Sequence, residues 1–139
     1  MGHENANVEL LRSAYASWSE TKGKSVDRWL SILADDIRFG PLIQGAPAMH
    51  YMQAASTRDA VRGYFEGLLG EWGMIHFTVD EFVAQGDAMF MRGSCAWRHK
   101  RTGKSVDTPK VDFWRFKDRK AVEFYEYFDT ARALAAATA

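Results

Sequence analysis

Two acidic residues lie among aromatic side chains on what should be one face of a sheet. Asp112 belongs to the alternating run 106–116, and Glu126 belongs to the next alternating run, 120–129. Because alternate residues of a strand point to the same face, each acid shares its face with large aromatic residues. These are Trp114, Phe116, Phe124 and Phe128. A buried acid needs a partner or must stay neutral, and such perturbed acids are typical of acid–base sites.

Each acid also has an interpretation without chemistry. Asp112 could be hydrogen-bonded to Tyr15 or to a backbone amide and serve only to hold the core together. Glu126 could lie near the mouth of a pocket and pair with an arginine or a lysine. His76 and His99 are candidates for a histidine–carboxylate pair, although neither lies in a recognisable motif and His76 is expected to be solvated.

Helices are predicted in the first half of the chain and long strands in the second. Apolar residues recur every three or four positions in helices 5–20, 26–33 and 58–69. Ser25 and Thr57 precede the second and third of these as N-caps. Residues 34–36 are expected to end the second helix, and a short strand is expected at 37–39. Four long strands are predicted at 74–84, 88–100, 106–116 and 120–129, joined by short turns.

This order of elements predicts one α+β domain over residues 1–139. Three N-terminal helices should pack on a strongly curved, mostly antiparallel sheet. The last two strands are apolar on both faces, so helices should cover one face, and a partner subunit is a candidate to cover the other. The connection 42–56 carries Met49, Tyr51 and Met52, and it is either a lid on a pocket or a loop packed on the core.

The composition narrows the functional classes. Basic and acidic residues both number 18, so the formal net charge is zero. This charge balance does not indicate a nucleic-acid-binding protein. Aromatic residues make up 14%, an excess that often lines a cavity or an interface. The single cysteine, Cys95, excludes an internal disulfide and predicts a cytoplasmic location. No apolar run is long enough to span a membrane, and no residue spacing indicates a metal or a cofactor.

Several stretches resemble the nuclear transport factor 2-like superfamily, which includes ketosteroid isomerase, SnoaL-type polyketide cyclases, limonene epoxide hydrolase and scytalone dehydratase. They are ADDIRF before Gly40-Pro41, VDFWRF at 111–116 and EFYEYFD at 123–129. The resemblance covers nearly the whole chain. It implies a cone-shaped α+β barrel around an apolar pocket, and a sheet whose other face often pairs in a homodimer.

The catalytic residues of these relatives are only partly present. The resemblance to ketosteroid isomerase places Tyr15 and a protonated Asp112 where two groups donate hydrogen bonds to a ligand oxygen, but its general base falls at Gly40. The resemblance to limonene epoxide hydrolase places Glu126 at one of its acids, but Gly93 and Cys95 occupy the other two positions. Neither mechanism is therefore carried over intact.

We expect a pocket for a small apolar or aromatic molecule, with Asp112, Tyr15 and Glu126 as candidate catalytic residues. The candidate ligand-binding residues are Trp18, Phe39, Phe65, Trp114, Phe124 and Phe128. If the protein is an enzyme, it is a cofactor-independent isomerase, dehydratase, cyclase or hydrolase acting on an apolar carbonyl or hydroxyl compound. The alternative is a non-catalytic ligand-binding or dimerisation module. We expect a homodimer formed through the sheet, and neither nucleic acid nor a membrane as partner.

Overall fold

The structure is a computed structural model that describes residues 2–40 and 46–139. In chain order its elements are α1 Gly2–Glu20, α2 Val26–Ile32, β1 Leu33–Gly40, the 3₁₀ helix η1 Pro47–Met49, α3 Arg58–Glu71, β2 Trp72–Gln85, β3 Ala88–His99, β4 Ser105–Lys117, β5 Lys120–Phe128 and α4 Thr130–Ala137. In the described part of the chain, no helix is both long enough and apolar enough to cross a bilayer.

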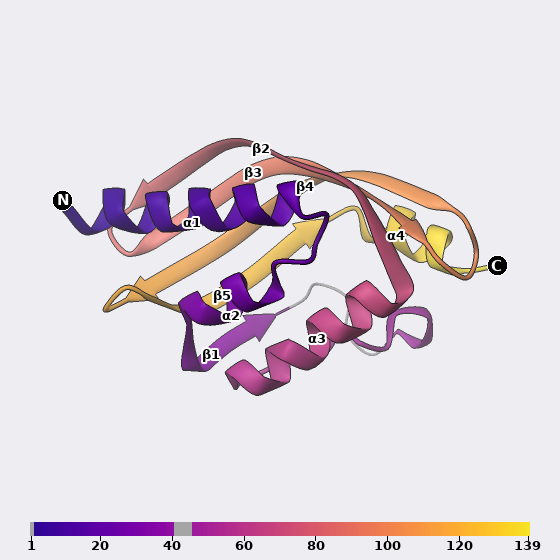
Figure 1. Cartoon of the computed structure of the whole chain (residues 1–139), viewed down its shortest axis with the longest axis horizontal. Coiled ribbons are helices and arrows are strands. Elements are labelled where there is room, and N and C mark those ends of the chain that lie inside the picture. The colour runs from indigo at the N-terminus through magenta and orange to yellow at the C-terminus, as the bar shows by residue number, and fades with distance from the viewer. Residues whose placement is uncertain (1, 41–45) are drawn as a thin grey trace.

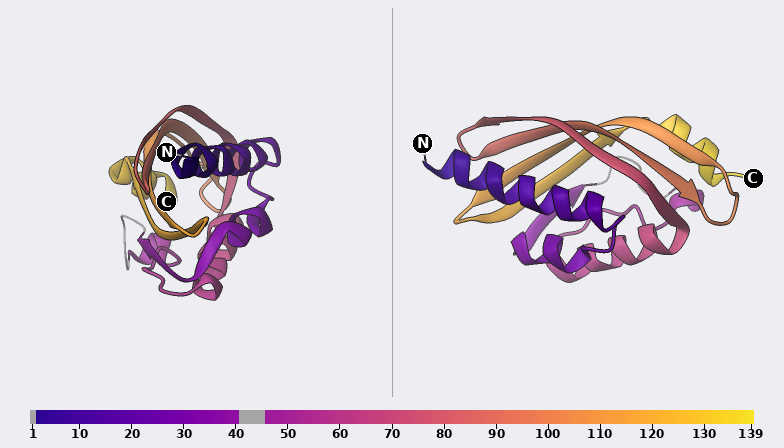
Figure 2. Two further views of the ribbon diagram at one scale, coloured as in Figure 1. Left: turned by 90° about the vertical axis from the view of Figure 1, so that its left-hand side faces the viewer. Right: turned by 45° about the horizontal axis from the view of Figure 1, so that its top comes forward.

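The five strands form one sheet in the order β1-β5-β4-β3-β2 (Figure 1). Strands β2 to β5 are a meander of antiparallel neighbours, and β1 joins the edge parallel to β5. Figure 2 shows the sheet curving over the helices, with α1, α2 and α3 on its concave side. The α+β class, the three N-terminal helices and the curved, mostly antiparallel sheet predicted from the sequence are confirmed.

The helices pack through the apolar stripes that their sequences predict. Tyr15 and Trp18 of α1 are at most 4% exposed, and Tyr64 and Phe65 of α3 are at most 8% exposed. The hydroxyl of Thr57 accepts a hydrogen bond from the Ala60 amide at 3.1 Å, which confirms Thr57 as the N-cap of α3. Both helices therefore present large aromatic side chains to the concave face.

The boundary between α2 and β1 differs most from the prediction, and other element ends differ by one to three residues. The second helix ends at Ile32, and residues 34–36 belong to β1 rather than to a helix terminus. The polar sequence suggested a break, but β1 is an edge strand, where exposed Asp35 and Asp36 side chains are tolerated. Ser25 stands at the N-cap position of α2, yet its side chain makes no capping hydrogen bond.

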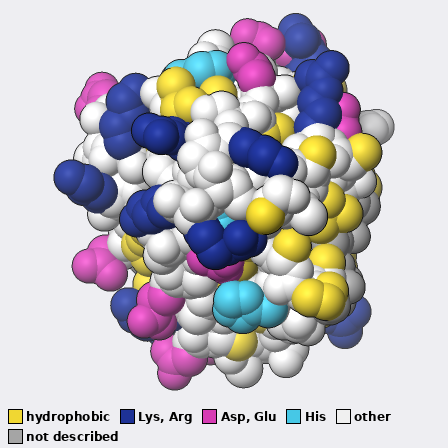
Figure 3. Space-filling view, turned by 90° about the vertical axis from the view of Figure 1, so that its right-hand side faces the viewer, with side chains coloured by type: hydrophobic (Ala, Val, Ile, Leu, Met, Phe, Trp, Pro, Cys, Tyr) yellow, Lys and Arg dark blue, Asp and Glu magenta, His cyan; other side chains and the backbone are white. Residues whose placement is uncertain are grey.

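The C-terminal helix is tied to the β3–β4 turn by basic side chains. Arg101 donates to the carbonyl of Ala137, and Lys104 donates to the carbonyl of Thr138, each at 2.7 Å. Figure 3 shows this end of the molecule, where several lysine and arginine side chains are spread over the surface. Cations near the last carbonyls of a helix are favourable, so these charges stabilise α4.

The connection after β1 is described from residue 46 onward, and the part of the predicted segment 42–56 before it lies outside the described residues. Met49, Tyr51 and Met52 are at most 7% exposed, and Phe39 exchanges two backbone hydrogen bonds with Ala55. The described part is thus packed onto the core and joined to β1.

Candidate functional site

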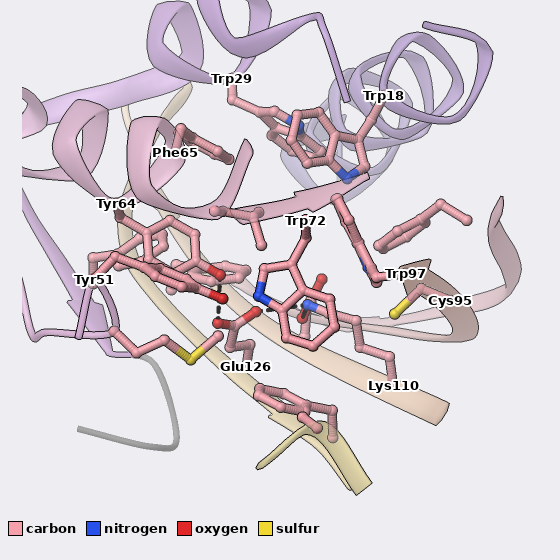
Figure 4. A pocket seen from close by; sticks show the side chains of 18 of the residues that line it. Trp18, Trp29, Tyr51, Tyr64, Phe65, Trp72, Cys95, Trp97, Lys110 and Glu126 are labelled. Atoms are coloured by element: carbon pink, nitrogen blue, oxygen red, sulfur yellow. Dashed lines mark hydrogen bonds and ion pairs between the residues drawn. The ribbon is translucent and has the colours of Figure 1, made fainter. Parts of the chain in front are cut away.

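A cavity of about 100 Å³ lies between the concave face of the sheet and the helices. All six aromatic residues that the sequence predicted as ligand contacts line it, and Figure 4 shows the side chains of this wall. Further aromatic rings complete the wall, namely Tyr15, Trp29, Tyr51, Tyr64, Trp72, Phe77 and Trp97. The excess of aromatic residues in the sequence is therefore concentrated around one apolar space.

The two carboxylates meet on the floor of this cavity. Asp112 of β4 and Glu126 of β5 are direct cross-strand partners, and they are 2% and 3% exposed. Lys110 lies two residues before Asp112 on the same face of β4. Its Nζ lies 2.8 Å from Asp112 Oδ1 and 2.8 Å from Glu126 Oε2. One buried ammonium group thus bridges both acids.

A tyrosine from a different helix holds each acid. Tyr15 of α1 donates to Asp112 Oδ2 at 2.5 Å, and its oxygen accepts from the Trp114 indole at 2.9 Å. Tyr64 of α3 donates to Glu126 Oε1 at 2.8 Å. The four carboxylate oxygens therefore each have one partner, and the whole group is fixed by both helices and both strands.

Burial and charge act on these groups in opposite directions. Burial raises the pKa of Asp112, and Lys110 opposes that rise. The pKa of Lys110 is raised because attraction to Asp112 and Glu126 outweighs the burial that would lower it. Burial and the adjacent carboxylates raise the pKa of Tyr15 and of Tyr64, so both hydroxyls stay protonated. Three ionisable groups and two protonated hydroxyls are thus in contact within an apolar space.

Two members of this site were not predicted from the sequence. Lys110 shares the period-two face of Asp112 and Trp114, so alternation along β4 could have identified it. Tyr64 belongs to the apolar stripe of α3, which core packing alone explains, and nothing in the sequence separates it from its neighbours. The structural interpretations of the two acids also correspond to contacts in the structure. Asp112 is hydrogen-bonded to Tyr15, and Glu126 is paired with a lysine, Lys110.

The positions where relatives of this fold carry other catalytic groups have structural roles here. A Cβ atom at Gly40 would overlap the ring of Tyr125, and one at Gly93 would overlap the carbonyl oxygen of Thr78. Cys95 lines the cavity, and burial raises the pKa of its thiol to about 11. These positions therefore supply no base in place of the missing ones.

The two candidate histidines are absent from the cavity wall. The side chain of His76 is 39% exposed and lies 3.8 Å from Asp107. His99 is buried, but its ring packs edge-on against Trp72, and its Nδ1 accepts from backbone amides of the following turn. Across residues 2–40 and 46–139, no three His, Cys, Asp or Glu side chains gather in a way that could hold a metal ion.

Comparison with solved structures confirms the fold. An NTF2-like protein of unknown function from Burkholderia pseudomallei is 24% identical with a TM-score of 0.83, over 96% of this chain and 98% of that one. TerC, co-crystallised with polyporic acid, is 20% identical with a TM-score of 0.79, over 94% and 97%. A candidate SnoaL-like polyketide cyclase from Jannaschia sp. is 17% identical with a TM-score of 0.77, over 98% and 94%.

No curated protein matches the chain. The resemblance to the nuclear transport factor 2-like superfamily is nevertheless confirmed by these structures and by a family match. The model of the SnoaL-like domain matches residues 11–124, which include Tyr15, Tyr64, Lys110 and Asp112. By that match, which spans most of its length, the chain belongs to the SnoaL-like domain family.

Proposed function

We propose that this protein is a cofactor-independent acid–base enzyme that acts on a small apolar molecule bearing a carbonyl or hydroxyl group. The observation that carries the proposal is the bridged group of Asp112, Lys110 and Glu126 on the floor of an aromatic cavity. Buried charges of this kind cost stability relative to apolar packing, so their presence beside a cavity favours a functional reason. A SnoaL-like polyketide cyclase candidate and a ligand-bound neighbour with the same fold support a small-molecule role.

The geometry supports a division of roles within the group. An ammonium group has three hydrogens, and two of those on Lys110 are used by the acids, so the third can stabilise negative charge on a ligand oxygen. Glu126 and Asp112 exchange protons with the ligand, because each carboxylate oxygen keeps a lone pair. Isomerisation, dehydration and cyclisation all need such proton transfers.

We assign Tyr15 a different role from the one expected from the sequence. Its hydroxyl already donates to Asp112 and accepts from Trp114, so it positions Asp112 instead of donating to the ligand. In this proposal Lys110, and not Tyr15, donates the hydrogen bond to the ligand oxygen. Tyr64 positions Glu126 in the same way.

Proton exchange in D₂O tests the proposal without knowledge of the substrate. Small cyclic ketones are incubated with the protein, and NMR measures deuterium at the carbon next to the carbonyl. We expect wild type to accelerate the exchange, and we expect Glu126→Gln to catalyse it at least about tenfold more slowly than wild type. A positioned general base typically accelerates a reaction by about 10² or more. Glu123→Gln is the matched control, because Glu123 lies on β5 and pairs with Arg115 away from the cavity.

The second candidate is a non-catalytic binding module, and it is favoured because every carboxylate oxygen of both acids already has a partner within the protein. Binding of a fluorescent naphthol with no exchange of any ketone would support that candidate and overturn the enzyme. A homodimer through the sheet is part of either proposal, since the outer face carries exposed Phe90 and Tyr127. A cytoplasmic location stays a prediction, based on the single cysteine.

A further inference from the structure

Two polar atoms in the cavity wall have no hydrogen-bond partner among the residues that the structure describes. They are the hydroxyl of Tyr51, which follows η1, and the indole Nε1 of Trp72, the first residue of β2. The two residues are 7% and 3% exposed, and both line the cavity. Buried polar groups nearly always have a partner, so two orphans in one wall need an explanation.

The two atoms face the same part of the cavity. Burial and the charge of Glu126 raise the pKa of Tyr51, and the nearby Trp72 indole N–H lowers it, so Trp72 and Glu126 both lie near the Tyr51 hydroxyl. The Trp72 N–H and the Tyr51 hydroxyl are near each other but do not meet the geometry of a hydrogen bond. Figure 4 shows the Tyr51 hydroxyl and the Trp72 ring nitrogen turned toward the interior, close to Glu126. Both groups can donate a hydrogen bond, so one acceptor atom placed between them would satisfy both.

Both donors are held rigidly. The Trp72 ring packs edge-on against His99 at a centroid distance of 4.7 Å. The Tyr51 ring lies 5.8 Å from that of Tyr64, and its Cβ and ring carbons stand where a side chain at Gly67 would be. Fixed donors recognise a ligand atom at a low entropic cost, so they are suited to setting specificity.

The charges around this point decide which kind of acceptor fits. The charged groups in the cavity wall are Lys110, Asp112 and Glu126, which give one positive and two negative charges when all are ionised. Lys110 is already shared between the two acids, and Glu126 lies close to Tyr51. A ligand carboxylate or phosphate at this point would meet the like charge of Glu126, and the cation of the described wall, Lys110, is already shared by two acids. A neutral oxygen is therefore favoured beside Tyr51 and Trp72.

We propose that Tyr51 and Trp72 form a second contact point that selects ligands with a neutral acceptor oxygen, such as a ketone, ester or amide carbonyl, over carboxylates and apolar analogues. The inference rests on the proposed function only in taking the ligand to be a small apolar molecule in this cavity. It adds the group by which that molecule is recognised, and it holds for an enzyme or for a binding module.

Three single-ring probes of similar size test the selection by calorimetry: acetophenone, benzoate and ethylbenzene. We expect the wild-type protein to bind acetophenone more tightly than either of the others. Tyr51→Phe should weaken the binding of acetophenone about three- to tenfold, which is the range for the loss of one hydrogen bond. It should leave the binding of ethylbenzene unchanged. Trp72→Phe should act in the same direction. Tyr127→Phe is the control, because Tyr127 is an exposed tyrosine on the outer face.

The outcomes separate this inference from the proposed function. Loss of acetophenone selectivity in Tyr51→Phe, with no proton exchange in wild type, would support the contact point and overturn the enzyme. Equal binding of acetophenone and ethylbenzene by wild type would overturn the contact point, whether or not exchange occurs, and that comparison needs no variant to fold. Benzoate binding as tightly as acetophenone would overturn the selection for a neutral group.

Discussion

Lys110 decides the electrostatics of the cavity because it is the shared partner of two buried acids. Its side chain is 10% exposed, and both of its ion pairs are 2.8 Å long. Without it, Asp112 and Glu126 would face each other across neighbouring strands with no positive charge between them. Removing one partner of a buried ion pair leaves an uncompensated charge and is strongly destabilising.

We therefore predict that Lys110→Met lowers the free energy of unfolding by about 3 to 5 kcal/mol at neutral pH, measured by urea denaturation. Lys117→Met, an exposed position on the same strand, should change it by less than about 0.5 kcal/mol. A Lys110→Met protein as stable as Lys117→Met would show that the acids do not need the ammonium group.

The same variant should show an altered pH dependence. Asp112 already has a raised pKa because it is buried, and loss of Lys110 removes the attraction that opposes this rise. An acid whose folded-state pKa lies above its unfolded value stabilises the fold when protonated, and this contribution is lost as the pH rises. The deficit of Lys110→Met relative to wild type should therefore shrink from about pH 7 to about pH 5. A constant deficit across this range in urea titrations would contradict the prediction.

At the scale of elements, the approach of β2 to β3 depends on Gly93. Gly93 pairs with Val79 just before an irregularity in β2, and an added Cβ would overlap the backbone oxygen of Thr78. Backbone cannot yield as a flexible side chain can, so the two strands would have to separate locally. The backbone at this point therefore leaves no room for a side chain at Gly93.

Gly93→Ala should accordingly destabilise the protein by about 1 to 3 kcal/mol, the usual cost of overpacking. Gly73→Ala is the matched control, because Gly73 lies in β2, within the same pair of strands, and an added Cβ there meets no atom within 4 Å. Thermal unfolding of the two variants provides the comparison, and equal melting temperatures would show that the strands can move apart without cost.

At the scale of the whole molecule, the outer face of the sheet carries a row of aromatic side chains. Phe90, Phe113 and Tyr125 are successive cross-strand partners, with ring centroids 5.1 and 6.2 Å apart. Val83 and Tyr127 beside them are 58% and 48% exposed. Figure 2 shows α1, α2 and α3 on the concave side of the sheet, opposite this outer face, and contiguous apolar surface of this kind often marks an interface.

We predict that the wild-type protein sediments as a dimer and that Phe90→Lys weakens the dimer at least about tenfold, because a lysine at the centre of an apolar interface leaves a buried charge. Ala16→Lys, an exposed change on α1 with the same added charge, should leave the dimer intact. A monomeric wild type in sedimentation velocity at the highest soluble concentration would remove the homodimer from the proposed function.

The sequence by itself determined the class of the fold and the face of the two acids. Period-two alternation fixes which side chains of β4 and β5 lie together, so Asp112, Trp114, Phe124 and Glu126 could be assigned to one face from their positions in the chain alone. Helical spacing likewise placed Tyr15 and Trp18 on the buried side of α1. These inferences succeed because the periods of helix and strand are local properties of the chain.

Only the tertiary structure decided which groups contact one another. The partners Tyr15 and Asp112 are 97 residues apart, and Tyr64 and Glu126 are 62 apart, so no local pattern connects them. Alternation places Lys110 on the face of Asp112, but only the tertiary structure shows that its ammonium group lies between the two acids. The unpaired donors of Tyr51 and Trp72 can likewise be recognised only in the folded structure. A polar atom counts as unpaired only once it is buried, and the sequence does not show which atoms are buried.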